Sequence, residues 1–212
     1  MRLYSYWRST AAYRVRIAME LKEINYDYVA VHLVKDGGHQ HSDSYRDINP
    51  MGLVPLLETD QGTISQSLSI IKFLESRCPE PSLYTGNNFL DAQIDSLALT
   101  ICCDIHPLNN LRVLQFLGDK LGAEPKQKDN WYKHWIKVGF EAVEKQITRY
   151  DKKYCFTDYP TLADICLVAQ VYNANRFECD LSGYPKIVEI NDRCLKLEAF
   201  KRAIPENQPD VD

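Results

Sequence analysis

Ser9 and Thr10 are adjacent hydroxyl residues at the junction between a predicted strand and a predicted helix. Residues 3–6 form a short aromatic strand pattern, and residues 11–21 carry apolar side chains at helical spacing. The first turn of a helix has unpaired N–H groups and the positive end of the helix dipole, so it favours an anion or a thiolate. Either hydroxyl could also serve as an ordinary N-cap. The segment is therefore either an anion-stabilising site or a plain helix start.

A second set of polar groups precedes another predicted helix. Gln66 and Ser67 offer an amide and a hydroxyl beside a helix N-terminus, which is suited to binding a carboxylate, although a simple helix cap has the same pattern. Val54 and Pro55 begin a predicted strand, where proline removes a hydrogen-bond donor. Pro55 is therefore expected at an edge or a turn, and a cis bond is one way to form such a turn.

The remaining candidate residues are weaker signals. His39 and His41 have a spacing found in some metal sites, but no third ligand is evident nearby, so we interpret them as solvated loop residues. His106, Asn110 and Arg112 fall within one long helical pattern, and Arg176 ends another. Each could be an ordinary surface residue. Phosphate-binding loops, dinucleotide fingerprints and the hydrolase nucleophile motif are absent.

Two differently organised regions carry these residues. Up to residue 80, strand and helix patterns alternate and predict a small mixed sheet covered by helices. The strands are expected at 3–6, 26–33, 54–57 and 62–65, and the helices at 11–21 and 67–74.

Residues 81–87 form a Pro- and Gly-containing linker, and residues 88–212 are predicted to be all-helical. Thr161 and Asp164 match a capping box, which we interpret as a helix start. The helical patterns cover residues 91–117, 130–150, 162–175 and 187–197.

The composition excludes several classes of protein. Hydrophobic residues make up 45% and charged residues 25%, which is typical of a globular chain. There are 25 basic and 29 acidic residues, a net charge of −4, and the basic ones are scattered, so we expect no nucleic-acid partner. The longest apolar stretch, residues 97–103, is too short to span a bilayer. Seven cysteines without a CxxC pair are typical of reduced thiols, so we expect a cytoplasmic protein.

Taken together, several segments make the chain similar to the zeta-class glutathione transferases, the maleylacetoacetate isomerases. They occur in the family's order over nearly the whole chain: residues 3–18 (LYSYWRSTAAYRVRIA), 49–55 (NPMGLVP), 65–68 (SQSL), 106–112 (HPLNNLR), 161–164 (TLAD) and 175–177 (NRF).

The resemblance implies the glutathione transferase fold, an α/β thioredoxin-like N-terminal domain followed by an all-α domain, as a homodimer. It also implies glutathione as cofactor and a small dicarboxylic keto acid as substrate. Ser9, with Thr10 beside it, would hydrogen-bond the glutathione sulfur, and Arg8 and Arg176 would receive substrate carboxylates. The implied glutathione-binding residues are Gln40, Val54, Pro55, Gln66, Ser67, His106, Asn110, Leu111 and Arg112.

The implied reaction converts maleylacetoacetate to fumarylacetoacetate in aromatic amino-acid catabolism. A thiolate adds reversibly to the cis double bond, the resulting single bond rotates, and elimination leaves the trans isomer. A free thiol with a pKa of ~8.5 is only ~3% ionised at pH 7. A pKa lower by ~2 units, worth ~2.7 kcal/mol, would make most of it thiolate.

One position departs from the family pattern. The family usually has a cysteine where this chain has Ala11, and Thr10 stands where it usually has a second serine. This departure leaves other functions open. They are a maleylpyruvate isomerase, a general glutathione transferase or dehalogenase of small α-halo acids, and a non-catalytic interaction module.

Overall fold

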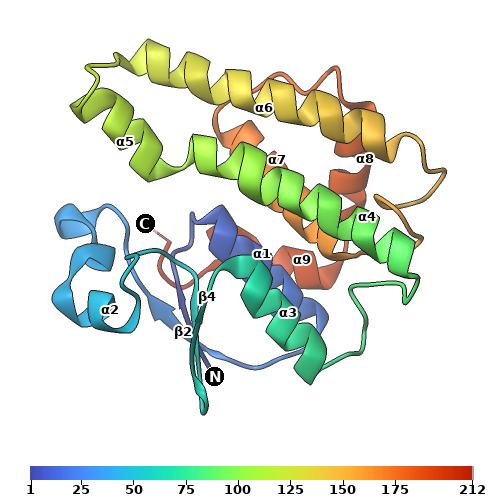
Figure 1. Ribbon diagram of the computed structural model, residues 1–212, viewed down its shortest axis with the longest axis horizontal. Coiled ribbons are helices and arrows are strands. Elements are labelled where there is room, and N and C mark those ends of the chain that lie inside the picture. The colour runs from blue at the N-terminus through green and yellow to red at the C-terminus, as the bar shows by residue number, and fades with distance from the viewer. Residues whose placement is uncertain (212) are drawn as a thin grey trace. The chain divides into compact units, whose positions relative to one another are not determined.

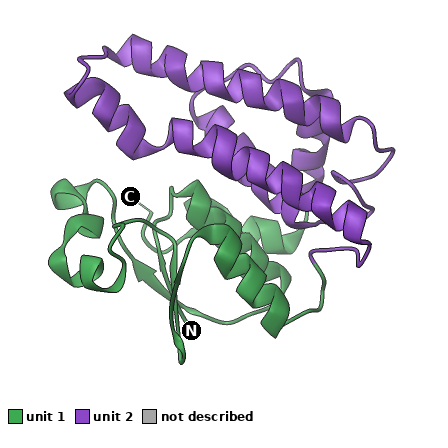
Figure 2. Ribbon diagram, viewed as in Figure 1, with its two compact units in different colours: residues 1–82, 195–212 green, residues 83–194 purple. Residues whose placement is uncertain are grey.

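The computed structural model describes residues 1–211 and forms two compact units. The first unit combines Met1–Ser82 with the C-terminal segment that begins at Leu195, and the second is Leu83–Cys194 (Figure 2). The boundary after residue 82 falls within the predicted linker, 81–87.

The first unit contains a four-stranded mixed sheet in the order β2-β1-β3-β4 (Figure 1). β1 pairs parallel with β2 and antiparallel with β3, which pairs antiparallel with β4. The predicted mixed sheet is therefore confirmed. The strands are β1 (Arg2–Ser5), β2 (Asp27–Ala30), β3 (Leu56–Thr59) and β4 (Gly62–Ser65).

Two long helices of this unit begin near the predicted positions. α1 (Thr10–Leu21) packs against α3 (Ser67–Arg77), and both run beside the sheet (Figure 1). α1 is buried on nearly all sides, because it also contacts α9 (Glu198–Ala203). The sequence did not predict α2 (Asp43–Ile48), whose six residues are too few for a periodic pattern.

The C-terminal segment belongs to a different unit from the one expected. The sequence assigned residues 88–212 to the helical domain, whereas the segment from Leu195 packs with the first unit. The Arg16 Nε–H donates to the Ala203 carbonyl at 3.2 Å, which fastens α9 to α1. Helical periodicity alone does not report which unit a short helix joins, so only the tertiary contacts settle this point.

The second unit is helical, as predicted. α7 lies at its centre and contacts α4 and α8, which explains why α7 has almost no exposed face. The Thr161–Asp164 capping box is confirmed at the start of α7, with both reciprocal hydrogen bonds present. The helices are α4 (Asn88–Leu99), α5 (Leu111–Asp119), α6 (Pro125–Ile147), α7 (Leu162–Arg176) and α8 (Pro185–Cys194).

The long helix predicted over residues 91–117 is interrupted. After α4 the chain forms a π-helical turn, Thr100–Ile105, and a 3₁₀ turn, His106–Asn109, before α5 begins. Pro107 has no N–H to continue an α-helix, and the Asn110 side chain starts α5 as its N-cap. Gly139 of α6 lets the π-helical turn approach, since a Cβ there would lie 2.2 Å from Ile105 Cδ1.

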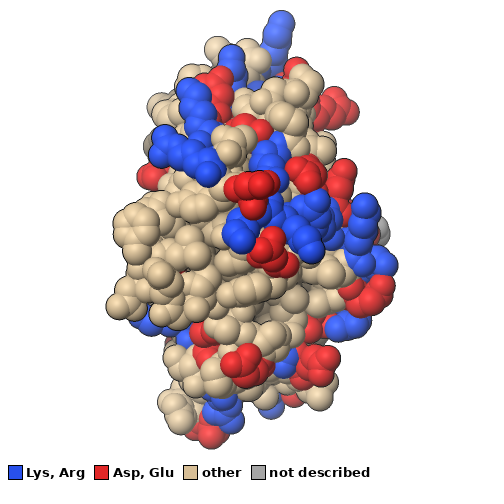
Figure 3. Space-filling view, turned by 90° about the vertical axis from the view of Figure 1, so that its right-hand side faces the viewer, with Lys and Arg blue, Asp and Glu red and all other residues tan. Residues whose placement is uncertain are grey.

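The distribution of charged side chains on the surface and the apolar character of the helices can be compared with the composition. In Figure 3, Lys and Arg side chains lie among Asp and Glu side chains on the face drawn. Over the described part of the chain, no helix combines the length and the apolar character needed to cross a membrane.

Candidate active site

Three segments at the same end of the sheet carry Ser9, Val54 and Gln66. In the register, Tyr4 of β1 pairs with Leu56 of β3, and Leu56 pairs with Ser65 of β4. The segment after β1, the one before β3 and the one after β4 therefore emerge side by side. The physical reason is the antiparallel pairing of β3 with both neighbours, because it puts the start of β3 at the same end of the sheet as the ends of β1 and β4.

Ser9 is the N-cap of α1. Its side-chain oxygen accepts the Ala12 N–H at 3.2 Å, and its own N–H donates to the Tyr6 carbonyl at 2.9 Å. The cap uses an acceptor lone pair of the hydroxyl, and the Ser9 hydroxyl proton is given to no other group within residues 1–211. The capping and the anion-stabilising interpretations are thus compatible. Thr10 is buried, whereas Ser9 is partly exposed.

Arg8 lies just before the cap with its side chain exposed. Its guanidinium stacks on the Trp7 ring, 4.2 Å from the ring centroid. Such stacking restrains the guanidinium while its N–H donors stay available at the ring's edge.

Val54 precedes β3 and is buried, and its bond to Pro55 is cis, one of the conformations that the sequence left open for this turn. The neighbouring Leu53 carbonyl accepts from the Tyr45 hydroxyl at 2.7 Å and from the Asn49 amide at 2.6 Å. Burial raises the pKa of Tyr45 to about 12, so its phenol remains a donor. These bonds fix the turn, while no group of residues 1–211 bonds the Val54 main chain.

Gln66 and Ser67 stand at the start of α3. Gln66 adopts φ 70° and ψ 121°, a region that non-glycine residues seldom occupy, and its side chain is exposed and does not cap the helix. The buried Ser67 hydroxyl accepts from the Arg14 guanidinium at 3.0 Å. An unusual backbone held by neighbouring contacts is common at binding sites, and here it directs the Gln66 side chain away from its own helix.

Gln40 lies in a 3₁₀ turn, His39–His41, and is buried. Its Nε2 donates to the Leu33 carbonyl at 3.3 Å, but its Oε1 is buried without a hydrogen-bond partner. Gly38 has φ 99°, and a Cβ there would lie 2.5 Å from the Gln40 side chain, so glycine is needed. An unpaired buried acceptor is costly unless a ligand or water donates to it.

The two loop histidines have protein partners. His39 Nε2 lies 3.2 Å from Asp36 Oδ2, and His41 Nε2 lies 3.0 Å from Gln40 Nε2. Within the described residues, no group of three or more His, Cys, Asp or Glu side chains has the arrangement of a metal site.

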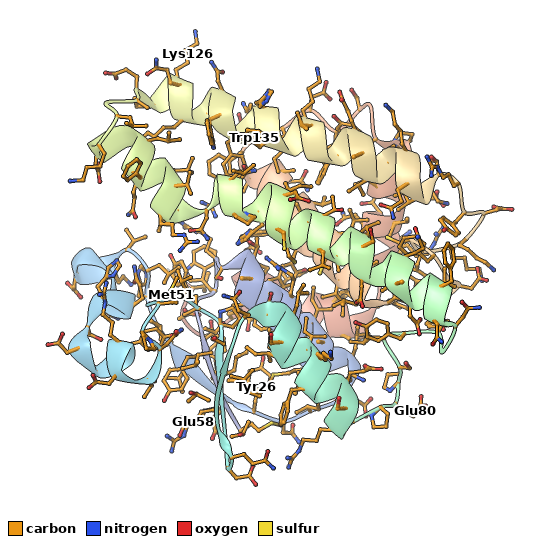
Figure 4. The ribbon with its side chains drawn as sticks, in the orientation of Figure 1. Tyr26, Met51, Glu58, Glu80, Lys126 and Trp135 are labelled. Carbon is orange, nitrogen blue, oxygen red and sulfur yellow. The ribbon has the colours of Figure 1, made fainter. Side chains whose placement is uncertain are left out.

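In the second unit, the 106–112 segment is held by Trp131, whose Nε1–H donates to the Leu108 carbonyl at 2.7 Å. Trp131 packs edge-to-face on Trp135, which lies on α6 (Figure 4). The Asn110 side chain accepts the Arg112 N–H at 3.1 Å. His106 is half-buried, and the Leu111 and Arg112 side chains are exposed.

Arg176 is the last residue of α7, and its side chain is exposed. Its guanidinium lies over the Phe177 ring, 4.9 Å from the centroid, and Phe177 stacks on Tyr132. This aromatic stack supports the guanidinium at the helix end without neutralising its charge.

The comparisons with known proteins bear on the family and the fold. Residues 3–82 match the family model described as glutathione S-transferase, N-terminal domain. The chain is 46% identical to the probable maleylacetoacetate isomerase of Vibrio cholerae, over 99% of this chain and 97% of that one. A solved holo structure of maleylpyruvate isomerase, a bacterial zeta-class glutathione S-transferase, is 41% identical, with a TM-score of 0.97 and full coverage of both chains.

The chain is a zeta-class glutathione transferase. A maleylacetoacetate isomerase from Methylobacterium extorquens AM1, solved with bound malonate and glutathione, is 33% identical, with a TM-score of 0.93 and full coverage of both chains. The fold and the family expected from the sequence are thus confirmed.

In this zeta-class transferase, the departure from the family pattern lies in the first turn of α1. Ala11 is only partly buried, and its methyl group offers no thiol at this position. The remaining polar groups at this helix start are hydroxyls and backbone amides.

Sequence reasoning missed the residues that hold this transferase's site in place. Arg14 and Arg16 of α1 were not among the candidate residues, yet both are buried. Arg16 donates to the Ser5 hydroxyl at 3.2 Å and to the Trp7 carbonyl at 3.0 Å. Two arginines among the apolar residues of one predicted helix are the sequence signal for such roles, because a buried arginine needs several acceptors.

Proposed function

We propose that this chain is a glutathione-dependent cis–trans isomerase that converts maleylacetoacetate to fumarylacetoacetate. The observation that carries the proposal is the Ser9 hydroxyl at the N-terminus of α1, which caps the helix and still has a proton to donate. It lies in the segment that leaves the sheet at the same end as Val54 and Gln66. The full-length similarity to maleylacetoacetate isomerases supports the choice of reaction.

The polar groups of the first unit fit a bound tripeptide. The Val54 main chain is available to pair with an extended peptide, and the Gln40 Oε1 needs a donor. Gln66 and Ser67, at the start of α3, would hold the γ-glutamyl end, where backbone amides favour a carboxylate. The glycyl end would approach Gln40, and the Pro55 turn would present Val54.

Ser9 would stabilise a negative sulfur in two ways. Its hydroxyl would donate a charge-assisted hydrogen bond, and the α1 dipole would add a favourable field, with Thr10 beside it. When bound, glutathione supplies the thiolate nucleophile that adds reversibly to the double bond. Together these protein groups could supply the ~2.7 kcal/mol that a pKa lower by ~2 units requires.

Two exposed guanidiniums are proposed to receive the carboxylates of the substrate. Arg8 belongs to the first unit and Arg176 to the second, and each guanidinium rests on an aromatic ring. Arginine pairs bidentately with carboxylates and stays charged at neutral pH. The malonate bound to the Methylobacterium relative is also a dicarboxylate. The residues proposed to contact glutathione from the helical unit are His106, Asn110, Leu111 and Arg112.

We also propose that the protein acts as a homodimer in the cytoplasm, with the N-terminal unit binding glutathione and the helical unit binding substrate. The apolar side chains of Met51, which Figure 4 labels, and of Phe89 are 63% and 72% exposed, which favours burial against a second copy. All seven cysteines are free thiols, which is typical of a reducing compartment.

Maleylpyruvate is the second candidate substrate. The similarity to the solved maleylpyruvate isomerase favours it, and both substrates carry a carboxylate at each end and one cis double bond. Maleylacetoacetate has one more methylene group, next to its far carboxylate, and no described side chain distinguishes the two substrates.

The proposal is tested by measuring glutathione binding by calorimetry and then isomerisation of both substrates side by side. We expect binding and a rate that depends on glutathione. A protein that does not bind glutathione would refute the proposal. Binding without isomerisation of either substrate, but with dehalogenation of an α-halo acid, would favour the transferase alternative.

A further inference from the structure

The Asp210 carboxylate contacts the segment that precedes Ser9. Its Oδ2 accepts the Trp7 N–H at 3.1 Å, although the two residues are far apart in sequence. Its Oδ1 accepts the Tyr28 hydroxyl at 2.7 Å. The carboxylate is thus fixed between β2 and the turn that joins β1 to α1.

The same turn is held on its other side by Arg16. The Trp7 carbonyl accepts from Arg16 Nη2 at 3.0 Å, and the Tyr6 carbonyl accepts from Nη1 at 3.4 Å. The Tyr6 carbonyl also accepts the Ser9 N–H. The Trp7 main chain is therefore bound through its N–H by the Asp210 carboxylate and through its carbonyl by the Arg16 guanidinium. Trp7 lies shortly before Ser9, the N-cap of α1.

The segment carrying Asp210 is itself folded tightly. Gln208 is buried, and its Nε2 donates to the Arg202 and Ile204 carbonyls at 3.0 and 2.9 Å. Arg16 fastens the preceding α9 through the Ala203 carbonyl. These bonds give the Asp210 carboxylate a fixed position from which it can hold Trp7.

We propose that Asp210 is a positioning residue, which sets the place of the Ser9 hydroxyl by holding the Trp7 main chain. Charge-assisted hydrogen bonds are stronger than neutral ones, and a small displacement of a catalytic group is costly in rate. The C-terminal segment is on this view a structural part of the catalytic centre. The inference rests on the proposed function only for its effect on catalysis.

Hydrogen exchange of the ligand-free protein tests the positioning by itself. In Asp210→Ala, loss of the Trp7 bond must accelerate exchange of the Trp7 amide in any case. The informative amides are those of Ser9, bonded to the Tyr6 carbonyl, and Ala12, bonded to the Ser9 hydroxyl. We expect both to exchange faster. Faster exchange of the Trp7 amide alone would overturn the proposal.

Two conservative variants separate positioning from general destabilisation. In Asp210→Asn, the amide can accept from Trp7 and donate to the Tyr28 oxygen, so we expect near wild-type exchange. Tyr28→Phe removes one of the two carboxylate bonds and should give an intermediate effect, which also serves if Asp210→Ala does not fold. Asp60→Ala, in the exposed turn between β3 and β4, is the matched control and should change neither amide. Equal acceleration in Asp60→Ala would refute the proposal.

Catalysis supplies the second measurement. In Asp210→Ala we expect a higher thiol pKa for bound glutathione, which is measured from the thiolate absorbance. We also expect kcat to be lower by up to about 10-fold, with little change in the KM for the dicarboxylate. An unchanged thiol pKa and kcat would refute the positioning role. If the wild-type protein does not bind glutathione, the proposed function fails, but the exchange result still decides whether Asp210 orders Ser9.

Discussion

The Arg14 guanidinium donates to the Ser67 hydroxyl at 3.0 Å, and both side chains are buried. This bond joins the first turn of α3 to α1, the helix that Ser9 caps. The two helix starts that carry the proposed thiolate and γ-glutamyl contacts are therefore fastened to each other. Changes at either start should affect binding and stability together, so each prediction below has a separate control.

Ser9→Ala should lower turnover by at least about 10-fold, because a hydrogen bond to a charged group is worth ~1.5–3 kcal/mol. Loss of the cap should also cost about 1 kcal/mol of stability. Steady-state kinetics and denaturant unfolding measure the two effects. Asn87→Ala, which removes the N-cap of α4, controls for the capping loss and should leave turnover unchanged. Unchanged turnover in Ser9→Ala would instead assign the role to Thr10 or Tyr6.

Arg176→Ala should chiefly raise the KM for dicarboxylate substrates, by about 10-fold, because a guanidinium–carboxylate pair is lost. Initial rates with dicarboxylates and with an uncharged electrophile distinguish this from a general effect. The exposed Arg149→Ala provides the matched control. An equal loss on the uncharged electrophile would argue against a carboxylate contact.

Arg16→Leu should lower the free energy of unfolding by about 3 kcal/mol or more, because several buried acceptors lose their donor. Those acceptors are the Ser5 hydroxyl and the carbonyls of Tyr6, Trp7 and Ala203. Urea unfolding measures the change, and Arg149→Leu should be near neutral. A loss below about 1 kcal/mol would mean that water replaces the guanidinium.

Gly139→Ala should destabilise the second unit by about 1–3 kcal/mol, since the new methyl group would overlap Ile105. A better helix propensity offsets part of this, by up to about 1 kcal/mol. Gly183→Ala is the control, because a Cβ there meets nothing within 4 Å. Thermal unfolding of both variants measures the difference in stability. Equal unfolding midpoints would show that the Ile105 side chain moves aside without a loss of stability.

Cys155 and Cys194 should resist alkylation until the protein unfolds. Both are buried, and burial raises the pKa of each thiol above its usual range, so little thiolate is present at neutral pH. Cys103 is exposed and serves as the internal reference. Peptide mapping after brief iodoacetamide treatment measures the order. Early labelling of Cys155 or Cys194 would reveal local opening of the second unit.

Much of the fold followed from local patterns. β4 lies where residues 62–65 were predicted to form a strand, and α7 begins at Leu162, directly after the predicted capping box. These elements are set by turn residues, capping side chains and periodic apolar positions, which are all properties of neighbouring residues. The family followed as well, because its motifs are contiguous segments of sequence.

The sequence by itself determined the type of most elements, the mixed sheet and the residues proposed to bind glutathione. The tertiary structure decided that the segment from Leu195 joins the first unit, that Arg16 is buried, and that the predicted 91–117 helix is interrupted. The reason is that a buried guanidinium or carboxylate depends on partners far away in the chain. Asp210 reaches Trp7 only because α9 packs on α1, and no local pattern around either residue encodes that contact.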